Sequence, residues 1–179
     1  MKWKHCQSGV SFYTGLDRLA IRDCPNLVSI AEGVIGCLTQ LKRLSIGGFS
    51  KKLKEFPGLN SINTSLEQLE LYGWERLSQL PDQIQHLTAL RYLWVSGFDG
   101  VEVLPDWLRN LSSLECLWVR KCKNLKQLPS AEAIRRLSKF HLLDIRDCPL
   151  LEERCAKESG PEWSKISHIP NISINDNPI

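Results

Sequence analysis

A short pattern, LxxLxL, returns along the chain at nearly constant intervals. Its first leucine is followed by an apolar residue three positions later and by another two positions after that. Copies open at Leu16, Leu41, Leu66, Leu90, Leu114 and Phe140. Subtracting these numbers gives intervals of 25, 25, 24, 24 and 26 residues. Six copies in register are very improbable by chance, and they require a fold built from stacked, similar units.

The fourth copy, residues 90–105, indicates what one unit does. Only residues 93–95 alternate like a strand, the next two residues turn the chain, and Leu104-Pro105 begins a return path. One unit cannot bury its own apolar side, so copies must stack. This core at this period is typical of leucine-rich repeats. We therefore expect an α/β solenoid, a leucine-rich-repeat horseshoe with a parallel β-sheet on its concave side and short helices, 3₁₀ turns or loops on its convex side.

The return segments of the third and fourth repeats follow the pattern LPxxIxxL or a close variant. Proline stands at the expected first helical position, and an acidic residue, Asp82 or Asp106, follows in the first turn. This spacing predicts one or two turns of helix, or a 3₁₀ turn. The second repeat is looser, because residues 51–52 insert a residue and the Pro-Gly pair at 57–58 breaks the helical spacing. We expect an irregular convex loop there.

Breaks in the period divide the chain into three parts. We expect a partial repeat or truncated N-terminal edge at residues 1–15, about six leucine-rich repeats at residues 16–151 and a C-terminal cap at residues 152–179. A solenoid end needs a polar cap, and the first part offers none that is convincing. We therefore expect the chain to be a piece of a longer protein or the product of a truncated gene.

The expected cap has two recognisable elements. A short helix starting at Glu152 should end at Gly160-Pro161. Further on, Ile172 and Ile174 alternate as in a strand. We expect this strand to lie beside residues 143–145 and to close the stack.

Seven cysteines are present, and three of them share one repeat position. Eight residues after the opening residue stand Cys24, Phe49, Trp74, Phe98, Cys122 and Cys148. A position that accepts cysteine, phenylalanine or tryptophan is a buried packing site, where free cysteine acts as a small hydrophobe. The odd number of cysteines, with no CxxC pair, favours free thiols in a reducing compartment over a disulfide framework or a metal site.

Composition and motifs exclude several functions. The formal net charge of +3 is too small for an electrostatic footprint on nucleic acid. The N-terminus lacks an apolar signal region, and no apolar run approaches the ~20 residues of a membrane span. GxSxG and HExxH do not occur, and the four histidines are scattered. We expect no enzyme, no metal site and no transmembrane helix.

The candidate binding residues are those around the strands that the core does not use. Neighbouring parallel strands lie ~4.8 Å apart, so equivalent residues of adjacent repeats should stand side by side on the concave surface. Five such residues form a candidate partner-binding patch: Tyr72, Tyr92, Trp94, Trp118 and Arg120. Aromatic residues and arginine dominate binding hot spots. Alternatively, the two tryptophans only cover each other as a structural ladder.

The C-terminal end carries the most specific sequence motif. It contains Cys148-Pro-Leu-Leu-Glu-Glu-Arg-Cys155, then Gly160-Pro-Glu-Trp163-Ser-Lys-Ile166 and His168-Ile-Pro170. This run resembles the end of the C-terminal leucine-rich-repeat domain of plant intracellular immune receptors of the coiled-coil, nucleotide-binding, leucine-rich-repeat type, the disease resistance proteins. The repeats resemble that family too, in the cysteine or aromatic residue after each strand and in the LPxxIxxL return.

The resemblance implies a protein-recognition region, ligand-sensing and autoinhibitory, that acts in the defence response in the cytoplasm. The implied partners are proteins: a pathogen effector, a host guardee or the receptor's own nucleotide-binding module. The parent receptor would bind ADP or ATP through a domain that this sequence does not contain, since it has no GxxxxGK[ST] loop. No cofactor is therefore expected for this chain.

Two other functions also fit the sequence. One is an extracellular repeat fragment of the receptor-like or inhibitor type, which three N-glycosylation sequons, at Asn63, Asn110 and Asn171, mildly favour. Against it stand the cysteines and aromatic residues at positions where such plant repeats usually carry asparagine. The other is the substrate-recognition repeat region of an F-box ubiquitin-ligase adaptor, whose repeats also favour cysteine there but usually lack the LPxxIxxL return.

Overall fold

The computed structural model of the chain describes residues 15–27, 30, 35, 38–49, 59, 62, 64–73 and 77–179. Its strands are β1 (Arg18–Arg22), β2 (Arg43–Gly47), β3 (Gln68–Tyr72), β4 (Tyr92–Ser96), β5 (Cys116–Arg120), β6 (Leu142–Arg146), β7 (Asn171–Ile174) and β8 (Asn177–Pro178). Its helices are the 3₁₀ turns η3 (Asp82–His86) and η4 (Asp106–Asn110) and the α-helices α1 (Ala131–Arg135), α2 (Pro149–Arg154) and α3 (Trp163–Ile166).

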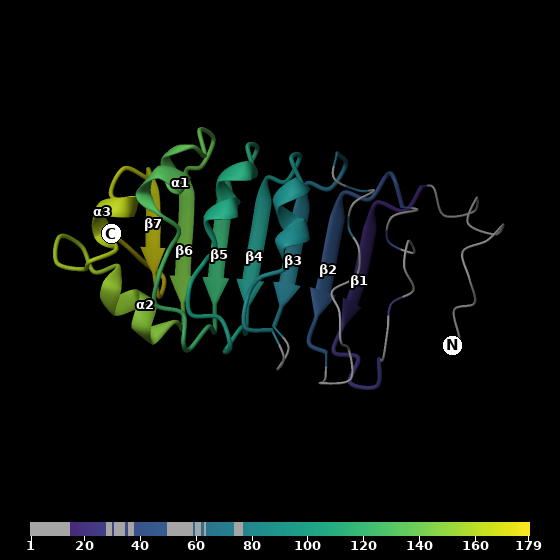
Figure 1. The fold of residues 1–179 in the computed structure, drawn as a ribbon, viewed down its shortest axis with the longest axis horizontal. Helices are drawn as coiled ribbons and strands as arrows, with labels where there is room; N and C mark the ends of the chain where they lie inside the picture. Colours follow the sequence, from purple (N-terminus) through teal and green to yellow (C-terminus); the bar gives the residue numbers. More distant parts are fainter. Residues whose placement is uncertain are drawn as a thin grey trace.

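The strands form one sheet in the order of the sequence, β1 to β8. Figure 1 shows β1 to β7 in this order. Strands β1 to β7 pair in parallel, and β8 pairs antiparallel to β7. Each repeat contributes one strand, and the register places equivalent residues opposite one another, as with Leu69, Leu93 and Leu117. The fold class expected from the period is confirmed.

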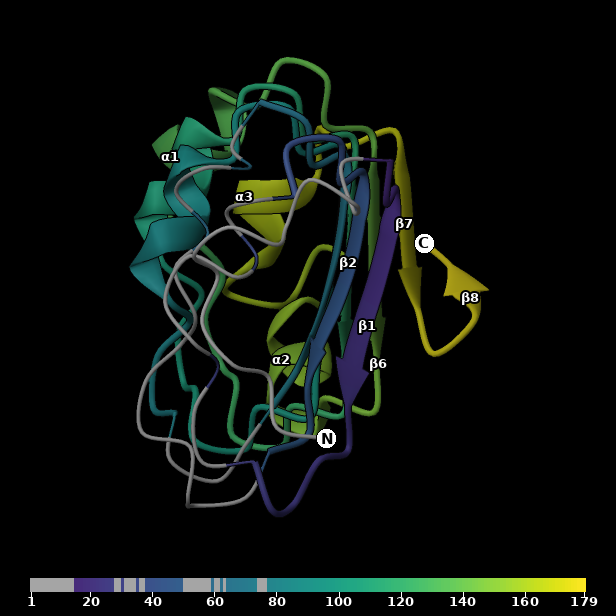
Figure 2. The ribbon, with the colours of Figure 1, turned by 90° about the vertical axis from the view of Figure 1, so that its right-hand side faces the viewer.

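The helices and return segments form a second layer behind the sheet. Figure 2, viewed along the stack, shows the strands on one side and the helices α1, α2 and α3 on the other. The 3₁₀ turns expected in the third and fourth repeats are present as η3 and η4. Pro81 and Pro105 are not their first residues, as expected from the sequence, but the capping residues just before them. The proline stays outside the turn with a non-helical backbone, and the acidic residue after it becomes the first residue of the turn. The convex loop expected at residues 51–58 lies outside the described residues.

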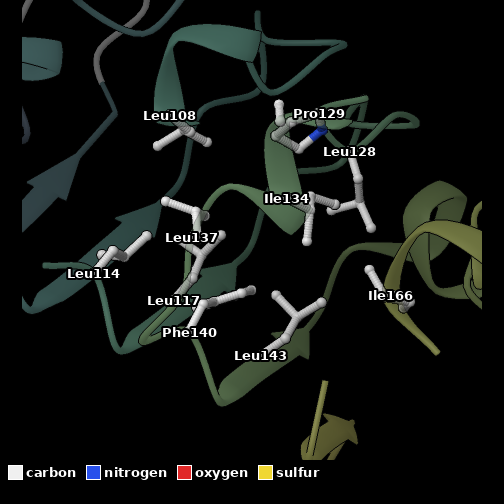
Figure 3. A pocket seen from close by; sticks show the side chains of 11 residues that line it. Leu108, Leu114, Leu117, Leu128, Pro129, Ile134, Leu137, Phe140, Leu143 and Ile166 are labelled. Carbon is white, nitrogen blue, oxygen red and sulfur yellow. The ribbon is translucent and has the colours of Figure 1, made fainter. Parts of the chain in front are cut away.

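The core lies between the two layers. The inward residues of β2 to β6 are buried, including Leu69, Leu93 and Val119. Each such side chain contributes ~1.5–3 kcal/mol on burial. A gap of about 10 Å³ lies between β5, β6 and α1 and is lined by apolar side chains (Figure 3). It is too small and too apolar for a ligand, so it is a packing defect and not a binding site.

The cysteine position after each strand is a packing site, as expected. Phe49, Phe98, Cys122 and Cys148 are buried there, and Cys24 is half-buried in the first described repeat. The three thiols also donate a hydrogen bond to the last strand residue two positions back, at 3.2 to 3.3 Å from the carbonyl oxygens of Arg22, Arg120 and Arg146. Trp74 lies outside the described residues.

A left-handed residue separates each of these strands from its cysteine or aromatic residue. Its φ is 54° at Lys121, 55° at Asp147 and 73° at Gly97. This conformation turns the chain inward, so the next side chain enters the core. The turn predicted for Ser96 and Gly97 is therefore confirmed at its second residue.

The C-terminal segment packs closely on the last repeat. The strand expected at Ile172 and Ile174 is confirmed as β7, and these residues pair with Leu143 and Ile145 of β6. The helix expected from Glu152 to Gly160 is shorter and earlier, because α2 begins at Pro149 and ends at Arg154. Proline at the first helical position starts it.

Gly160 has another role, since it lies against the end of that helix. A β-carbon there would come within 2.2 Å of the carbonyl oxygen of Arg154, so no other residue fits without a backbone shift.

A buried carboxylate joins this segment to the preceding return path. Glu162 is 3% exposed and accepts a hydrogen bond of 2.9 Å from the backbone N–H of Leu128. Lys165 pairs with the same carboxylate at 2.7 Å and donates to the Leu128 carbonyl at 3.4 Å. Arg154 approaches the second oxygen at 3.6 Å.

The division into residues 1–15, 16–151 and 152–179 stays a prediction, and residues 1–14 lie outside the described residues.

Candidate protein-recognition face

The sheet turns one face away from the helices, and we call it the outer face. In each strand the first, third and fifth residues point to it, because the second and fourth enter the core. The third residues of β1 to β6 are Ala20, Ser45, Glu70, Trp94, Trp118 and Asp144. Two tryptophans thus stand at the centre of the outer face, with one carboxylate on each side.

Trp94 and Trp118 stack face to face. Their ring centroids are 3.9 Å apart, and the ring planes are 3° from parallel. Tyr92 contacts both rings, at 6.4 Å from each centroid and tilted by 46° and 43°. The three rings form a half-buried aromatic cluster on two neighbouring strands. Their positions lie outside the repeated core pattern, so the fold does not need them there.

Tyr72 belongs to a polar cluster beside the aromatic one. Its hydroxyl donates to Glu70 at 3.2 Å, and the Arg22 guanidinium lies 4.8 Å from its ring centroid. Arg22 also pairs with Glu70 and donates to Ser45. Burial and the neighbouring Glu70 charge raise the pKa of Tyr72, so this phenol stays protonated at neutral pH.

Arg120 belongs to a second polar cluster on the other side of the tryptophans. It donates to Asp144 at 3.2 Å, and Arg146 donates to the same carboxylate at 2.9 and 3.1 Å. Asp144 is only 3% exposed beneath the two guanidinium groups. Arg146 also pairs with Asp176. The Nε atom of Arg120 is buried without a hydrogen-bond partner in the described part of the chain.

Opposite charges alternate along the edge where the strands begin. Lys42 pairs with Glu67 at 3.7 Å, and Arg91 pairs with Glu115 through two hydrogen bonds of 2.8 and 3.0 Å. The hydrogen bonds from Arg91 hold the pKa of Glu115 below its ordinary value. These pairs were not among the residues predicted from the sequence. They could be found in the sequence from the alternation of opposite charges at the position just before each strand, compared from one repeat to the next.

The structure brings together only part of the candidate patch. Tyr92, Trp94 and Trp118 make ring contacts, whereas Tyr72 and Arg120 engage their own carboxylates. In the register, Ser96 of β4 separates Tyr72 from Arg120. The five residues therefore share three adjacent strands of the outer face but do not form one continuous contact.

Two features are absent from the described residues. None of their His, Cys, Asp and Glu side chains form a group of three or more that could hold a metal ion. Within the same part of the chain, every helix is too short or too polar to cross a bilayer.

One short strand per repeat, a parallel sheet and return segments with 3₁₀ turns define a leucine-rich-repeat protein. Residues 82–148 match the leucine-rich-repeat family described as R13L1/DRL21 LRRs. The putative disease resistance protein RGA4 of Solanum bulbocastanum is 44% identical over 54 residues, which is 30% of this chain and 5% of that protein. The chain thus carries a leucine-rich-repeat domain related to plant disease resistance proteins, and the resemblance seen in its sequence is confirmed.

Two solved structures resemble the chain, and the first of them supports its fold. The leucine-rich-repeat protein LIC12759 of Leptospira interrogans matches with a TM-score of 0.55 at 20% identity, over 84% of this chain and 44% of that one. An internalin (inlF) of Listeria monocytogenes matches with a TM-score of 0.46 at 15% identity, over 92% of this chain and 56% of that one. The chain spans less than half of LIC12759 and a small part of RGA4, so neither defines its activity.

Proposed function

We propose that this chain is the protein-recognition region of a cytoplasmic plant disease resistance protein, in which it senses a ligand and holds the receptor inactive without one. The observation that carries the proposal is the half-buried cluster of Tyr92, Trp94 and Trp118 on the outer face. Exposed aromatic surface of this kind supports partner binding, because a few aromatic and arginine anchors supply most of the energy of a protein interface.

The proposed contact surface extends to Tyr72 and Arg120 on either side of the cluster. Both are half-buried and held in place by Glu70 and Asp144. Side chains that are already ordered lose less conformational entropy when a partner binds. The partner would be a protein: a pathogen effector, a host guardee or the receptor's own nucleotide-binding module.

We also propose that residues 152–179 cap the repeats. The pairing of β7 with β6 and the Glu162 contacts with the preceding return path support this role. Without the segment, the apolar edge of the last repeat would face solvent.

The test of the recognition proposal is co-precipitation of the tagged chain from plant tissue after cross-linking. Bound proteins would be quantified for the wild type, for Trp94→Ala/Trp118→Ala and for Trp107→Ala. Trp107 is the matched control, because it lies in η4 on the opposite layer. We expect a nucleotide-binding module, an effector or a host protein that the first variant loses and the control retains. Equal recovery by all three proteins would contradict the proposal.

A further inference from the structure

The outer face is more basic than the chain as a whole. On β1 to β6, its outward positions carry five arginines, Arg18, Arg22, Arg43, Arg120 and Arg146, and two carboxylates, Glu70 and Asp144. Five positive charges against two negative ones leave +3 on this face. The whole 179-residue chain carries the same formal net charge, so the rest of it is balanced.

Two of these arginines have no counter-charge among the described residues. Arg22 pairs with Glu70, and Arg120 and Arg146 pair with Asp144. Arg18 and Arg43 are exposed and make no side-chain hydrogen bond or ion pair with any residue that the structure describes. They are direct register partners on β1 and β2. Like charges opposite each other on neighbouring strands repel, so this pair destabilises the free sheet.

The arginine pair and the aromatic cluster lie on one line across the strands. The register runs from Arg18 to Arg43, Gln68 and Tyr92. At ~4.8 Å for each strand, Arg43 lies about 10 Å and Arg18 about 14 Å from Tyr92. An extended segment rises ~3.3 Å for each residue, so about four residues cover this distance.

From this arrangement we propose that the outer face binds an acidic segment of a partner protein, with carboxylates at Arg18 and Arg43 and an aromatic or leucine side chain at the Tyr92–Trp94–Trp118 cluster. The inference rests on the proposed function and names the chemistry of the partner at its binding site. Charge complementarity of this kind steers association and selects the partner. A nucleic acid fits less well, because its phosphates would lie beside Glu70 and Asp144 along the same face.

The test selects binders from a phage library of random peptides about twelve residues long, long enough to span the line from Arg18 to Trp118. The purified 179-residue chain is the bait. We expect enriched peptides with several Asp or Glu residues and an aromatic residue or leucine about four positions away. The best peptide, synthesised with a fluorophore, would then be titrated against the variants.

The double variant Arg18→Ser/Arg43→Ser should bind that peptide roughly tenfold more weakly than the wild type. Added salt should lower the affinity of the wild type toward that of the double variant. Arg109→Ser/Arg135→Ser is the matched control, because it removes the same charge from the helix layer, and it should bind like the wild type. Charge reversal, Arg18→Glu/Arg43→Glu, should switch the selection to basic peptides. Melting temperatures of all variants identify any that fail to fold. If the serine double variant does not fold, the peptides selected by Arg18→Glu/Arg43→Glu decide whether the face recognises charge.

The contrary results separate a failure of this inference from a failure of the proposed function. Peptides that need Trp94 and Trp118 but are not acidic would overturn this inference and leave the proposed function standing. Binding that neither the tryptophan nor the arginine substitutions affect would overturn both, and so would a selection without enrichment. Equally tight binding of a labelled thymidine oligonucleotide would also overturn the inference, because the face would then select phosphates.

Discussion

Trp94 and Trp118 lie on adjacent strands with their rings 3.9 Å apart and parallel to within 3°. Such a stack stabilises the sheet by about 0.5–1.5 kcal/mol beyond the area that it buries. The same stack also presents a rigid apolar surface between two ordered polar clusters. A structural ladder and a recognition site therefore predict the same geometry. They differ in the effect of substitution, which lowers stability if the stack is a ladder and partner binding if it is a recognition site.

Three buried cysteines, Cys116, Cys148 and Cys155, should be free and unreactive in the native protein. Burial raises the pKa of Cys155 to about 12, and burial also raises the pKa of Cys116. The hydrogen bond with Cys122, together with burial, raises the pKa of Cys148. Thiolates are the reactive form, so iodoacetamide at pH ~8 should label these three at least about tenfold more slowly than half-buried Cys24.

Peptide mapping of labelled protein measures these rates. After unfolding without a reductant, all seven cysteines should take up the label. Fast native labelling of Cys155 would show that its site is open, and a shortfall of labels in freshly prepared protein would reveal a disulfide.

Glu162 should be the residue on which the C-terminal segment depends most. Glu162→Ala leaves the buried N–H of Leu128 without its acceptor, which costs about 1–3 kcal/mol of unfolding free energy. Glu153→Ala is the control, because Glu153 is exposed in α2 and its side chain has no partner within the described residues. Urea unfolding measures the cost, and hydrogen exchange of the Asn171 amide shows whether β7 detaches first.

The cap proposal has a coarser test in the same segment. Deleting residues 161–179 removes α3, β7 and β8, so the apolar edge of β6 should become exposed and the protein should aggregate. If the shortened chain stays monomeric with an unchanged melting temperature, the segment is a tail and not a cap.

Asp106 should make stability depend on pH in the acid range. Its carboxylate accepts from the N–H and the hydroxyl of Ser130 at 2.7 and 2.9 Å, and the backbone hydrogen bond is the main reason that its pKa is lowered. A lowered folded-state pKa means that the contribution is complete above the ordinary Asp value and is lost as the pH falls through the folded value.

The variant Asp106→Asn should therefore lose about 0.5–1 kcal/mol at neutral pH, with solvent screening allowed for. The gap to the wild type should close as the pH falls below about 4. Asp82→Asn is the control, because Asp82 opens η3 in the same way but its side chain has no hydrogen bond or ion pair with the described residues. A pH-independent gap would show that the charge of Asp106 is not what matters.

The repeat period predicts a large part of this structure. An interval of 24 residues between Trp94 and Trp118, both at the centre of a strand, is enough to place their rings side by side. The burial of Cys122 and Cys148 follows from the same argument. Spacing predicts such features because equivalent positions in stacked repeats have equivalent surroundings.

Other contacts carry no periodic signal. Glu162 reaches Leu128 from 34 positions away, in a segment where the repeat has ended. The sharing of Asp144 by Arg120 and Arg146 depends on side-chain rotamers, which spacing does not specify. Helix boundaries also shift, as the early start of α2 at Pro149 shows, since several nearby residues could open that turn.

The most direct measurement for the recognition proposal is partner binding by Trp94→Ala/Trp118→Ala, with the melting temperature of the same protein recorded alongside. The partner is the protein recovered by the wild type after cross-linking, and Trp107→Ala is the control. We predict that the double variant keeps most of its stability and loses at least about 2 kcal/mol of binding free energy, as the loss of an interface anchor requires. A lowered melting temperature with partner binding intact would contradict the proposal and make the stack a structural ladder.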